Sequence, residues 1–126
     1  MMTSETAPLS AGFENSVLDA TACFRVVLDA MSRPAKIHSL PVSISPPRGL
    51  SVGTVAVLLT LGDMDTPVWL APECDTAEAR AYLRFHAGCP ILDDPEQAVF
   101  AVVSVERDLS ITEELSLGSA EYPDRS

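Results

Sequence analysis

Two segments decide the fold of this chain: VLLTLGDMDTPVWL at residues 57–70 and LRFHAGCPILDDPEQAVFAVV at residues 83–103. In both segments a short polar turn with a nearby proline interrupts apolar sequence. Packing explains the leucines and valines of these runs. It does not by itself explain Asp63, Asp65 and Thr66 in the first turn, or Arg84 and His86 in the second. We therefore expect whatever the protein does to be encoded near these two turns.

The apolar runs predict helices that alternate with short strands. Residues 50–61 are apolar on every side, which suits a buried helix with Ser51 as its candidate N-cap, although their valines leave a strand open. Strands are predicted at residues 66–71 and 98–105, with a short extended piece at residues 90–92. Because residues 98–105 are almost uniformly apolar, we expect both faces of that strand to be covered.

The clearest helix is predicted at residues 75–87. Asp75 is placed at its N-cap and Glu78 at the third helical position, where a carboxylate can accept free backbone N–H groups. Gly88 follows the last helical residue and is expected to end the helix in the left-handed conformation. Arg84 and His86 then fall in the last turn of this helix.

A second helix is predicted near the N-terminus, at residues 16–31. Ser16 followed by Asp19 resembles a capping box. Apolar residues at helical spacing predict the face that packs on the core: Val17, Phe24, Val27, Leu28 and Met31. A short strand is predicted after this helix, at residues 36–41.

Together these elements predict an α/β domain with a mixed sheet flanked by helices. The chain has 126 residues, of which 47% are hydrophobic, which suits one domain with a real core. We assign that domain to residues 13–126. Residues 1–12 are rich in Ser, Thr, Glu and Pro and are predicted to form a mobile tail.

Charge and composition exclude several classes of function. The formal net charge is −10 and Lys36 is the sole lysine, so the basic stripe that nucleic acids require is missing. No run of about 18 apolar residues is present, so no membrane span is predicted. The 3 cysteines cannot all pair with one another, which favours reduced thiols and a cytoplasmic location.

The sequence contains little that supports phosphate binding, metal binding or covalent catalysis. The phosphate-binding pattern G-x-x-x-x-G-K-[ST] is absent. His86 and Cys89 make only a lone pair, whereas zinc sites take three or four ligands, and His38 is isolated. Schiff-base chemistry would depend entirely on Lys36, which we interpret as a solvated residue. We therefore predict no metal and no cofactor.

The polar residues of the two turns each have two interpretations. Asp63 and Asp65 could act as general acid and base, or they could hold a helix-ending turn through hydrogen bonds to backbone N–H groups. The turn is the interpretation we favour. Arg84 and His86 could contact an anion or a neighbouring subunit, or they could complement the negative end of their helix. The sequence does not decide between these two interpretations of Arg84 and His86.

Several segments, taken in order, resemble one known family. They are FRVVLDAMSRP at residues 24–34, SVGTVAVLLTLGDMDTPVWL at residues 51–70, LRFHAGCPIL at residues 83–92, PEQAVFAVV at residues 95–103 and LSLGSAEYPD at residues 115–124. This combination resembles the PhnH subunits of the bacterial carbon–phosphorus lyase system. The matching motif positions, which become candidate interface or ligand contacts, are Arg33, Asp63, Asp65, Thr66, Pro67, Arg84, His86 and Pro90.

The resemblance carries expectations about fold, partners and activity. It implies a fold related to the pyridoxal-phosphate-dependent transferases but without that cofactor, a homodimer, and a core assembly with the PhnG, PhnI and PhnJ subunits. That system uses ATP and an alkylphosphonate to form ribose 1-alkylphosphonate 5-triphosphate with loss of adenine. No catalytic residue is carried over. Family members continue beyond the segment at residues 115–124, so this chain is expected to lack their C-terminal third.

Three functional hypotheses follow. The leading one is a non-catalytic subunit of the phosphonate-metabolising complex that works through protein contacts. The alternative is a free-standing enzyme acting on a phosphonate or phosphate ester through Asp63, Asp65, Arg84 and His86. The third is a protein that binds a cofactor through Lys36.

Overall fold

Three parallel strands form the centre of the protein, whose computed structural model describes residues 12–104, 113 and 115. β1 (Val68–Leu70) lies in the middle, between β2 (Ile91–Leu92) and β3 (Phe100–Val102). Val68 is paired with Ile91 on one side and with Phe100 on the other. The predicted α/β class is confirmed. The described strands all run parallel, so the mixed part of the expected sheet is not seen among them.

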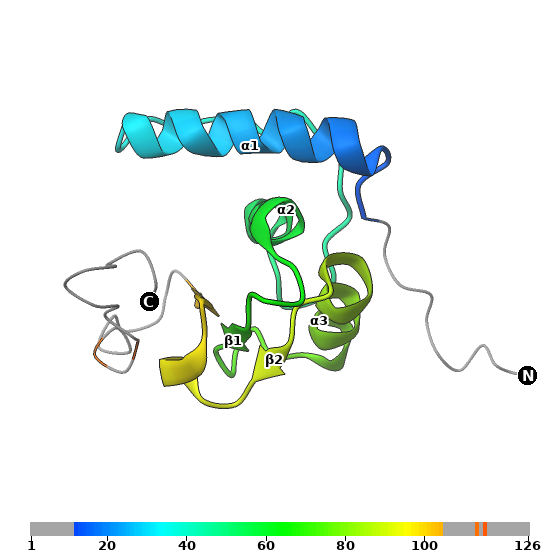
Figure 1. Cartoon of the computed structure of the whole chain (residues 1–126), viewed down its shortest axis with the longest axis vertical. Helices are drawn as coiled ribbons and strands as arrows, with labels where there is room; N and C mark the ends of the chain where they lie inside the picture. The colour runs from blue at the N-terminus through cyan, green and yellow to red at the C-terminus, as the bar shows by residue number, and fades with distance from the viewer. Residues whose placement is uncertain (1–11, 105–112, 114, 116–126) are drawn as a thin grey trace, which may run out of the picture.

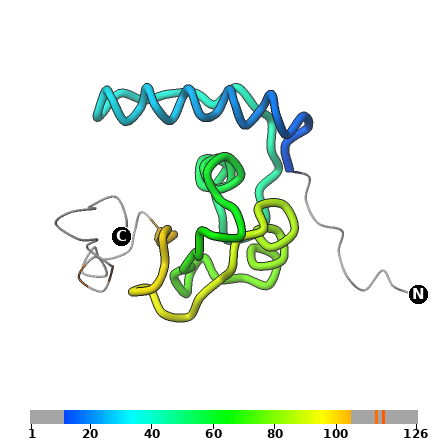
Figure 2. Tube along the Cα trace, viewed as in Figure 1, coloured from blue at the N-terminus to red at the C-terminus, as the bar shows by residue number. Residues whose placement is uncertain are grey.

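Helices cover the strands in two further layers (Figure 1). Their bounds are α1 (Ser16–Ser32), α2 (Val52–Leu61) and α3 (Ala77–Tyr82), followed by a π-helical turn at Leu83–Ala87 and a 3₁₀ turn at Pro95–Gln97. α1 is the outermost element, and α2 lies between it and the strands. Figure 2 shows that the chain after α1 turns back and runs along that helix before it reaches α2.

The main core lies between α2, α3 and one face of the sheet. Its buried members are Leu50, Val55, Leu58, Val68, Leu70, Cys74, Ala79, Tyr82, Leu83, Cys89 and Val102. Trp69 points to the opposite face, where it packs with Ala71 and Ala98. This alternation is the period of two expected of a strand. Because both faces of β1 are covered, all three of its residues are buried.

The N-caps predicted for α1 and α3 are each shifted by one residue. α1 is capped by Asn15 rather than Ser16, with the Asn15 side chain accepting the Leu18 N–H and the Asp19 carboxylate accepting the Asn15 N–H. α3 is capped by Thr76 rather than Asp75. Asn and Thr cap as well as Ser and Asp do, so residue type alone did not fix the position. The predicted cap of α2, Ser51, is confirmed by its bond to the Thr54 N–H.

The predicted core-facing side of the first helix is wrong for four of its five residues. Val17, Leu28 and Met31 are exposed and Phe24 is 44% exposed, whereas Val27 is half-buried. Cys23 is the buried residue of α1 instead. Helical spacing shows which residues share a face, but it does not show which face turns inward.

Two predicted strands also differ from the structure. Residues 36–41 form no strand. His38 links this segment to α1 through the Asp29 carboxylate, with Nε2 2.6 Å from Oδ2. β3 is shorter than predicted, and Val105 lies outside the described residues. Among the described strands β3 pairs only with β1, and Phe100 and Ala101 are half-buried rather than covered on both faces. The predicted N-terminal tail lies outside the described residues except for Gly12.

A strained turn follows α1. The Lys36 N–H donates to the Arg33 carbonyl at 3.3 Å, with Pro34 and Ala35 between them. Ala35 has φ of 71°, in the left-handed region that favours glycine. Proline followed by a residue with positive φ is the pattern of a type II turn.

Replacing Ala35 with glycine is expected to raise the free energy of unfolding by about 0.5–1 kcal/mol. Removing the Cβ relieves about 1–2 kcal/mol of left-handed strain, and the greater freedom of glycine in the unfolded chain offsets part of it. Urea unfolding followed by Trp69 fluorescence measures the change. Ala81→Gly, at an exposed position in α3, is the control and should lower stability. A loss of stability in Ala35→Gly would contradict the strained turn.

Candidate functional site

The first of the two turns, residues 62–67, is held by its own polar groups. The Thr66 hydroxyl donates to the Asp63 carbonyl at 2.9 Å and lies 2.6 Å from the Asp63 N–H. The Asp63 carboxylate accepts the Asp65 N–H at 2.8 Å. Asp63 and Asp65 are both exposed. These bonds support the turn interpretation, since the Asp63 carboxylate serves the backbone beside it.

The second turn is a π-helical turn rather than the regular helix end that was predicted. It runs over Leu83–Ala87 and closes at Gly88, whose φ is 73° and whose N–H donates to the Leu83 carbonyl at 2.9 Å. Gly88 therefore ends the helical segment as expected. Arg84 is exposed and Phe85 is 73% exposed. π-turns of this kind, closed by a glycine in the left-handed conformation, occur at the C-terminal ends of helices.

His86 lies in a partly enclosed position on this turn. Its ring is 4.5 Å from the Tyr82 ring and 4.9 Å from the Phe85 ring, measured between centroids. A Cβ built on Gly12 would lie 2.8 Å from His86 Nδ1, so the chain before α1 passes directly over the imidazole. Aromatic contacts and this close backbone approach therefore fix the orientation of His86.

The two turns meet at Cys89. The Thr66 hydroxyl lies 3.9 Å from the Cys89 sulfur, and the Val68 N–H donates to the Pro90 carbonyl at 2.8 Å. A Cβ on Gly62 would lie only 2.6 Å from the same sulfur. Sequence analysis did not single out Cys89 as this junction. Its position between Gly88 and Pro90, where a turn enters a strand, was the available signal.

Arg33 and Pro67 make their bonds away from this junction. Arg33 pairs with Asp29 at the end of α1, with Nε 3.2 Å from Oδ1. Pro67 acts through its carbonyl, which accepts the Val99 N–H at 2.8 Å. Within the described part of the chain, no ion pair links Arg84 to Asp63 or Asp65. Arg84 is therefore not paired with either carboxylate of the first turn in that part of the chain.

The Cys89 thiol is unsuited to nucleophilic attack. It is buried, and burial raises its pKa. The Thr66 hydroxyl lowers that pKa and the nearby Asp63 charge raises it. A thiol with a raised pKa holds its proton at neutral pH, whereas the thiolate is the reactive form. The pKa of Cys23 is raised by burial as well.

These buried thiols predict a loss of stability at alkaline pH. Because the folded state raises the pKa of Cys89, its contribution is fully present at neutral pH and is lost as the pH rises above about 9. We expect the urea midpoint to fall between pH 7.5 and 10, as estimated from ordinary thiol pKa values. Cys89→Ala should make that fall smaller, and Glu78→Ala, on the exposed side of α3, should not. An unchanged pH dependence in Cys89→Ala would contradict the prediction.

Both turns lie at the amino ends of the parallel strands, since each precedes the strand that it feeds. In open α/β sheets ligands usually bind at the carboxyl ends of the strands. At that edge the Arg80 guanidinium contacts both oxygens of Asp75, at 2.5 and 2.9 Å, and reaches Asp93 at 3.4 Å. This contact lowers the pKa of Asp75. The sequence predicted a capping role for Asp75 and did not predict its pair with Arg80.

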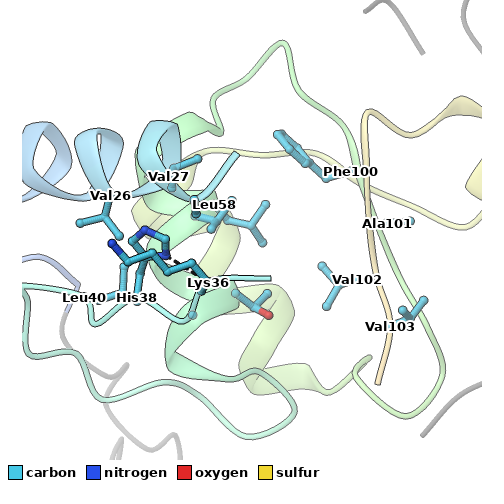
Figure 3. A pocket seen from close by; sticks show the side chains of 14 residues that line it. Val26, Val27, Lys36, His38, Leu40, Leu58, Phe100, Ala101, Val102 and Val103 are labelled. Carbon is cyan, nitrogen blue, oxygen red and sulfur yellow. Dashed lines mark hydrogen bonds between the residues drawn. The ribbon is translucent and has the colours of Figure 1, made fainter. Parts of the chain in front are cut away.

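A separate cavity of about 580 Å³ lies between α1, α2 and β3 (Figure 3). Its lining is mainly apolar, and Lys36 and His38 approach from one side. Lys36 is exposed, as predicted, and His38 is held by Asp29 and the Lys36 carbonyl. Among the described residues no group of three potential metal ligands is found. No helix in that part of the chain is long and apolar enough to cross a membrane.

Fold and site define a small α/β protein with a parallel sheet and two polar turns that meet beside a buried thiol. A family model described as bacterial phosphonate metabolism protein (PhnH) matches residues 11–126. The chain is also 35% identical, over 125 residues, to the alpha-D-ribose 1-methylphosphonate 5-triphosphate synthase subunit PhnH of Rhizobium meliloti (strain 1021). The alignment covers 99% of this chain and 62% of that relative. The chain belongs to the PhnH family.

Proposed function

We propose that this chain acts as a subunit of a complex that metabolises organophosphonates. The observation that carries the proposal is the family match over residues 11–126, supported by similarity to a named synthase subunit. The activity of the complex is then the formation of ribose 1-alkylphosphonate 5-triphosphate from ATP and an alkylphosphonate. The partners are the PhnG, PhnI and PhnJ subunits, and the location is the cytoplasm.

The subunit contributes protein contacts rather than catalytic groups. This assignment is supported by the self-contained bonding of the Asp63 turn and by the buried Cys89 thiol. It is also supported by the exposure of Arg84 and Phe85, two residue types that are enriched in protein interfaces. We assign the contact surface to the two turns, with Met64, 76% exposed, on the first.

The remaining parts of the proposal concern architecture. Residues 13–126 form one domain of a fold related to the pyridoxal-phosphate-dependent transferases, without that cofactor. The α/β class and the parallel strands are compatible with this relation. As part of the same proposal, the protein works as a homodimer. Since the chain spans 62% of the length of its Rhizobium relative, activity belongs to the whole protein within its assembly.

Growth and assembly, measured on the same variants, test the function. In a strain whose own gene is deleted, Phe85→Ser is expected to abolish co-purification with PhnG, PhnI and PhnJ. Growth on methylphosphonate as the sole phosphorus source should be lost with it. Truncating an anchoring aromatic residue at an interface weakens binding by about 30-fold or more. Ile37→Ser, which is 94% exposed and lies away from both turns, is the matched control and should leave both unchanged.

The alternative, a free-standing enzyme, gives a different pattern in the same experiment. Asp65→Ala or His86→Ala would then abolish growth while the complex still assembles. Under the proposal, growth is lost only where assembly is lost. A wild-type protein that never co-purifies with the other subunits would overturn the assembly role itself.

A further inference from the structure

The cavity between α1, α2 and β3 has the size and lining of a small-molecule site. Its volume of about 580 Å³ falls within the range of ligand pockets, about 300–1,000 Å³. Each of the three elements contributes apolar side chains to the lining, among them Val26, Val57, Leu58, Phe100 and Val102. Water in such a space finds few hydrogen-bonding partners, so an apolar group that displaces it gains free energy.

Lys36 supplies a positive charge at the edge of this cavity. It is the one lysine of the chain, it lines the cavity, and it is exposed. No carboxylate of the described residues lies within ion-pair distance of its ammonium group. The nearest acidic side chain along the chain, Asp29, is already engaged by Arg33 at 3.2 Å and by His38 at 2.6 Å. The Lys36 charge is therefore available to a bound anion.

The backbone of Lys36 is fixed in place beside the cavity. Its N–H donates to the Arg33 carbonyl at 3.3 Å, across the strained turn that follows α1. Its carbonyl accepts from His38 Nδ1 at 3.0 Å, and the other nitrogen of that ring is held by the Asp29 carboxylate. A ligand then has to order only the side chain of the lysine, which lowers the entropic cost of binding.

The charged and apolar parts of the lining lie apart. Figure 3 shows Lys36 and His38 on one side of the cavity and Phe100, Val102 and Val103 of the β3 segment on the other. A ligand that matches this arrangement has an apolar tail and an anionic group at one end of it. Lys36 and Gly53 are both exposed, so the cavity can be entered from solvent.

The charge balance selects the kind of anion. Lys36 offers a single positive charge in a chain whose formal net charge is −10. A carboxylate carries one negative charge at neutral pH, which one lysine compensates. A phosphonate or phosphate group carries up to two, and the second would be repelled by the acidic chain. The site therefore favours a carboxylate over a phosphonate.

We propose that this cavity binds a carboxylic acid with an apolar tail. The tail lies between α1, α2 and β3, and the carboxylate pairs with the Lys36 ammonium group. His38 is a positioning residue that holds the backbone of Lys36. The site is separate from the two turns and does not rest on the proposed function.

Calorimetric titration of the intact purified protein tests the class of ligand. Octanoate is expected to bind, 1-octylphosphonate to bind more weakly, and octyltrimethylammonium not to bind. An absence of octanoate binding at concentrations up to about 10 mM would overturn the proposal. Octylphosphonate binding as tight as that of octanoate, or tighter, would overturn the choice of a carboxylate. Equal binding of the octyl cation would show that Lys36 does not select the ligand.

Variants of two lining residues test the location. Lys36→Gln is expected to weaken octanoate binding by about 2- to 5-fold, the range of an exposed ion pair, and Lys36→Arg should restore most of it. Gly53→Leu fills part of the cavity at a position where an added Cβ meets nothing within 4 Å. It is expected to weaken binding by about 10-fold or more.

Arg48→Gln is the matched control, because it removes one positive charge from an exposed residue outside the lining. It should leave octanoate binding unchanged, and circular dichroism should show that all the variants are folded. Unchanged binding in Lys36→Gln or in Gly53→Leu would contradict the assigned site, as would an equal loss in Arg48→Gln. These titrations use the protein without the other subunits, so their failure is distinguishable from a failure of the assembly role.

Discussion

Replacing Leu58 with alanine is expected to lower the free energy of unfolding by about 2–5 kcal/mol. Leu58 is 2% exposed and belongs to the main core between α2 and the sheet. Truncation removes buried methyl groups and leaves a cavity that the rigid neighbours fill only in part. Urea unfolding followed by the fluorescence of Trp69, the chain's one tryptophan, measures the change.

Met64→Ala is the matched control for this substitution. Met64 lies in the turn that follows the same helix and is 76% exposed, so its truncation should change stability by less than about 0.5 kcal/mol. If Leu58→Ala changed stability as little as Met64→Ala does, Leu58 would not be packed as the structure places it.

Replacing Gly62 with alanine is expected to destabilise the junction of the two turns by about 1–3 kcal/mol. A Cβ at this position would lie 2.6 Å from the Leu58 carbonyl oxygen and 2.6 Å from the Cys89 sulfur. The carbonyl belongs to the backbone of α2 and cannot move aside without disturbing that helix. The strain therefore falls on the Cys89 side, where the thiol contacts Thr66. Unfolding in urea and the reactivity of Cys89 toward iodoacetamide measure the two effects.

Gly53→Ala provides the comparison within the same helix. A Cβ on Gly53 meets nothing within 4 Å, and alanine has the higher helix propensity. This variant should be as stable as the wild type, or more stable by up to about 1 kcal/mol. Equal behaviour of the two glycine variants would show that the junction is not closely packed.

The deciding segments predicted the sheet region well because their signals are local. Four of these features depend only on neighbours in sequence: the apolar run of α2, its Ser51 cap, the strand at β1 and the glycine that ends the π-turn. The inward side of α1 and the edge position of β3 depend on which element packs against which. Periodicity and hydrophobicity contain no such information, and both predictions failed at that point.

In the candidate site, too, the local features were predictable and the long-range contacts were not. The bonding within the Asp63 turn was predictable, since Asp, Thr and Pro in that order favour side-chain bonds to the local backbone. The junction at Cys89 was not, because it joins residues that only the parallel pairing of β1 and β2 brings together. The Asp75–Arg80 pair was also missed, since a capping role for Asp75 explained that residue without it.

The order of the strands has a consequence for how the protein is made. Among the described strands β1 comes first in sequence and lies in the middle of the sheet, so both of its neighbours are synthesised after it. The Val68 N–H donates to the Pro90 carbonyl and the Ala71 N–H donates to the Val102 carbonyl, so neither bond can form until the later residue has been synthesised. Until both strands have emerged, a strongly apolar segment has open hydrogen-bonding groups on either side. On the ribosome, residues 68–71 therefore lack these backbone partners until residue 102 has been synthesised.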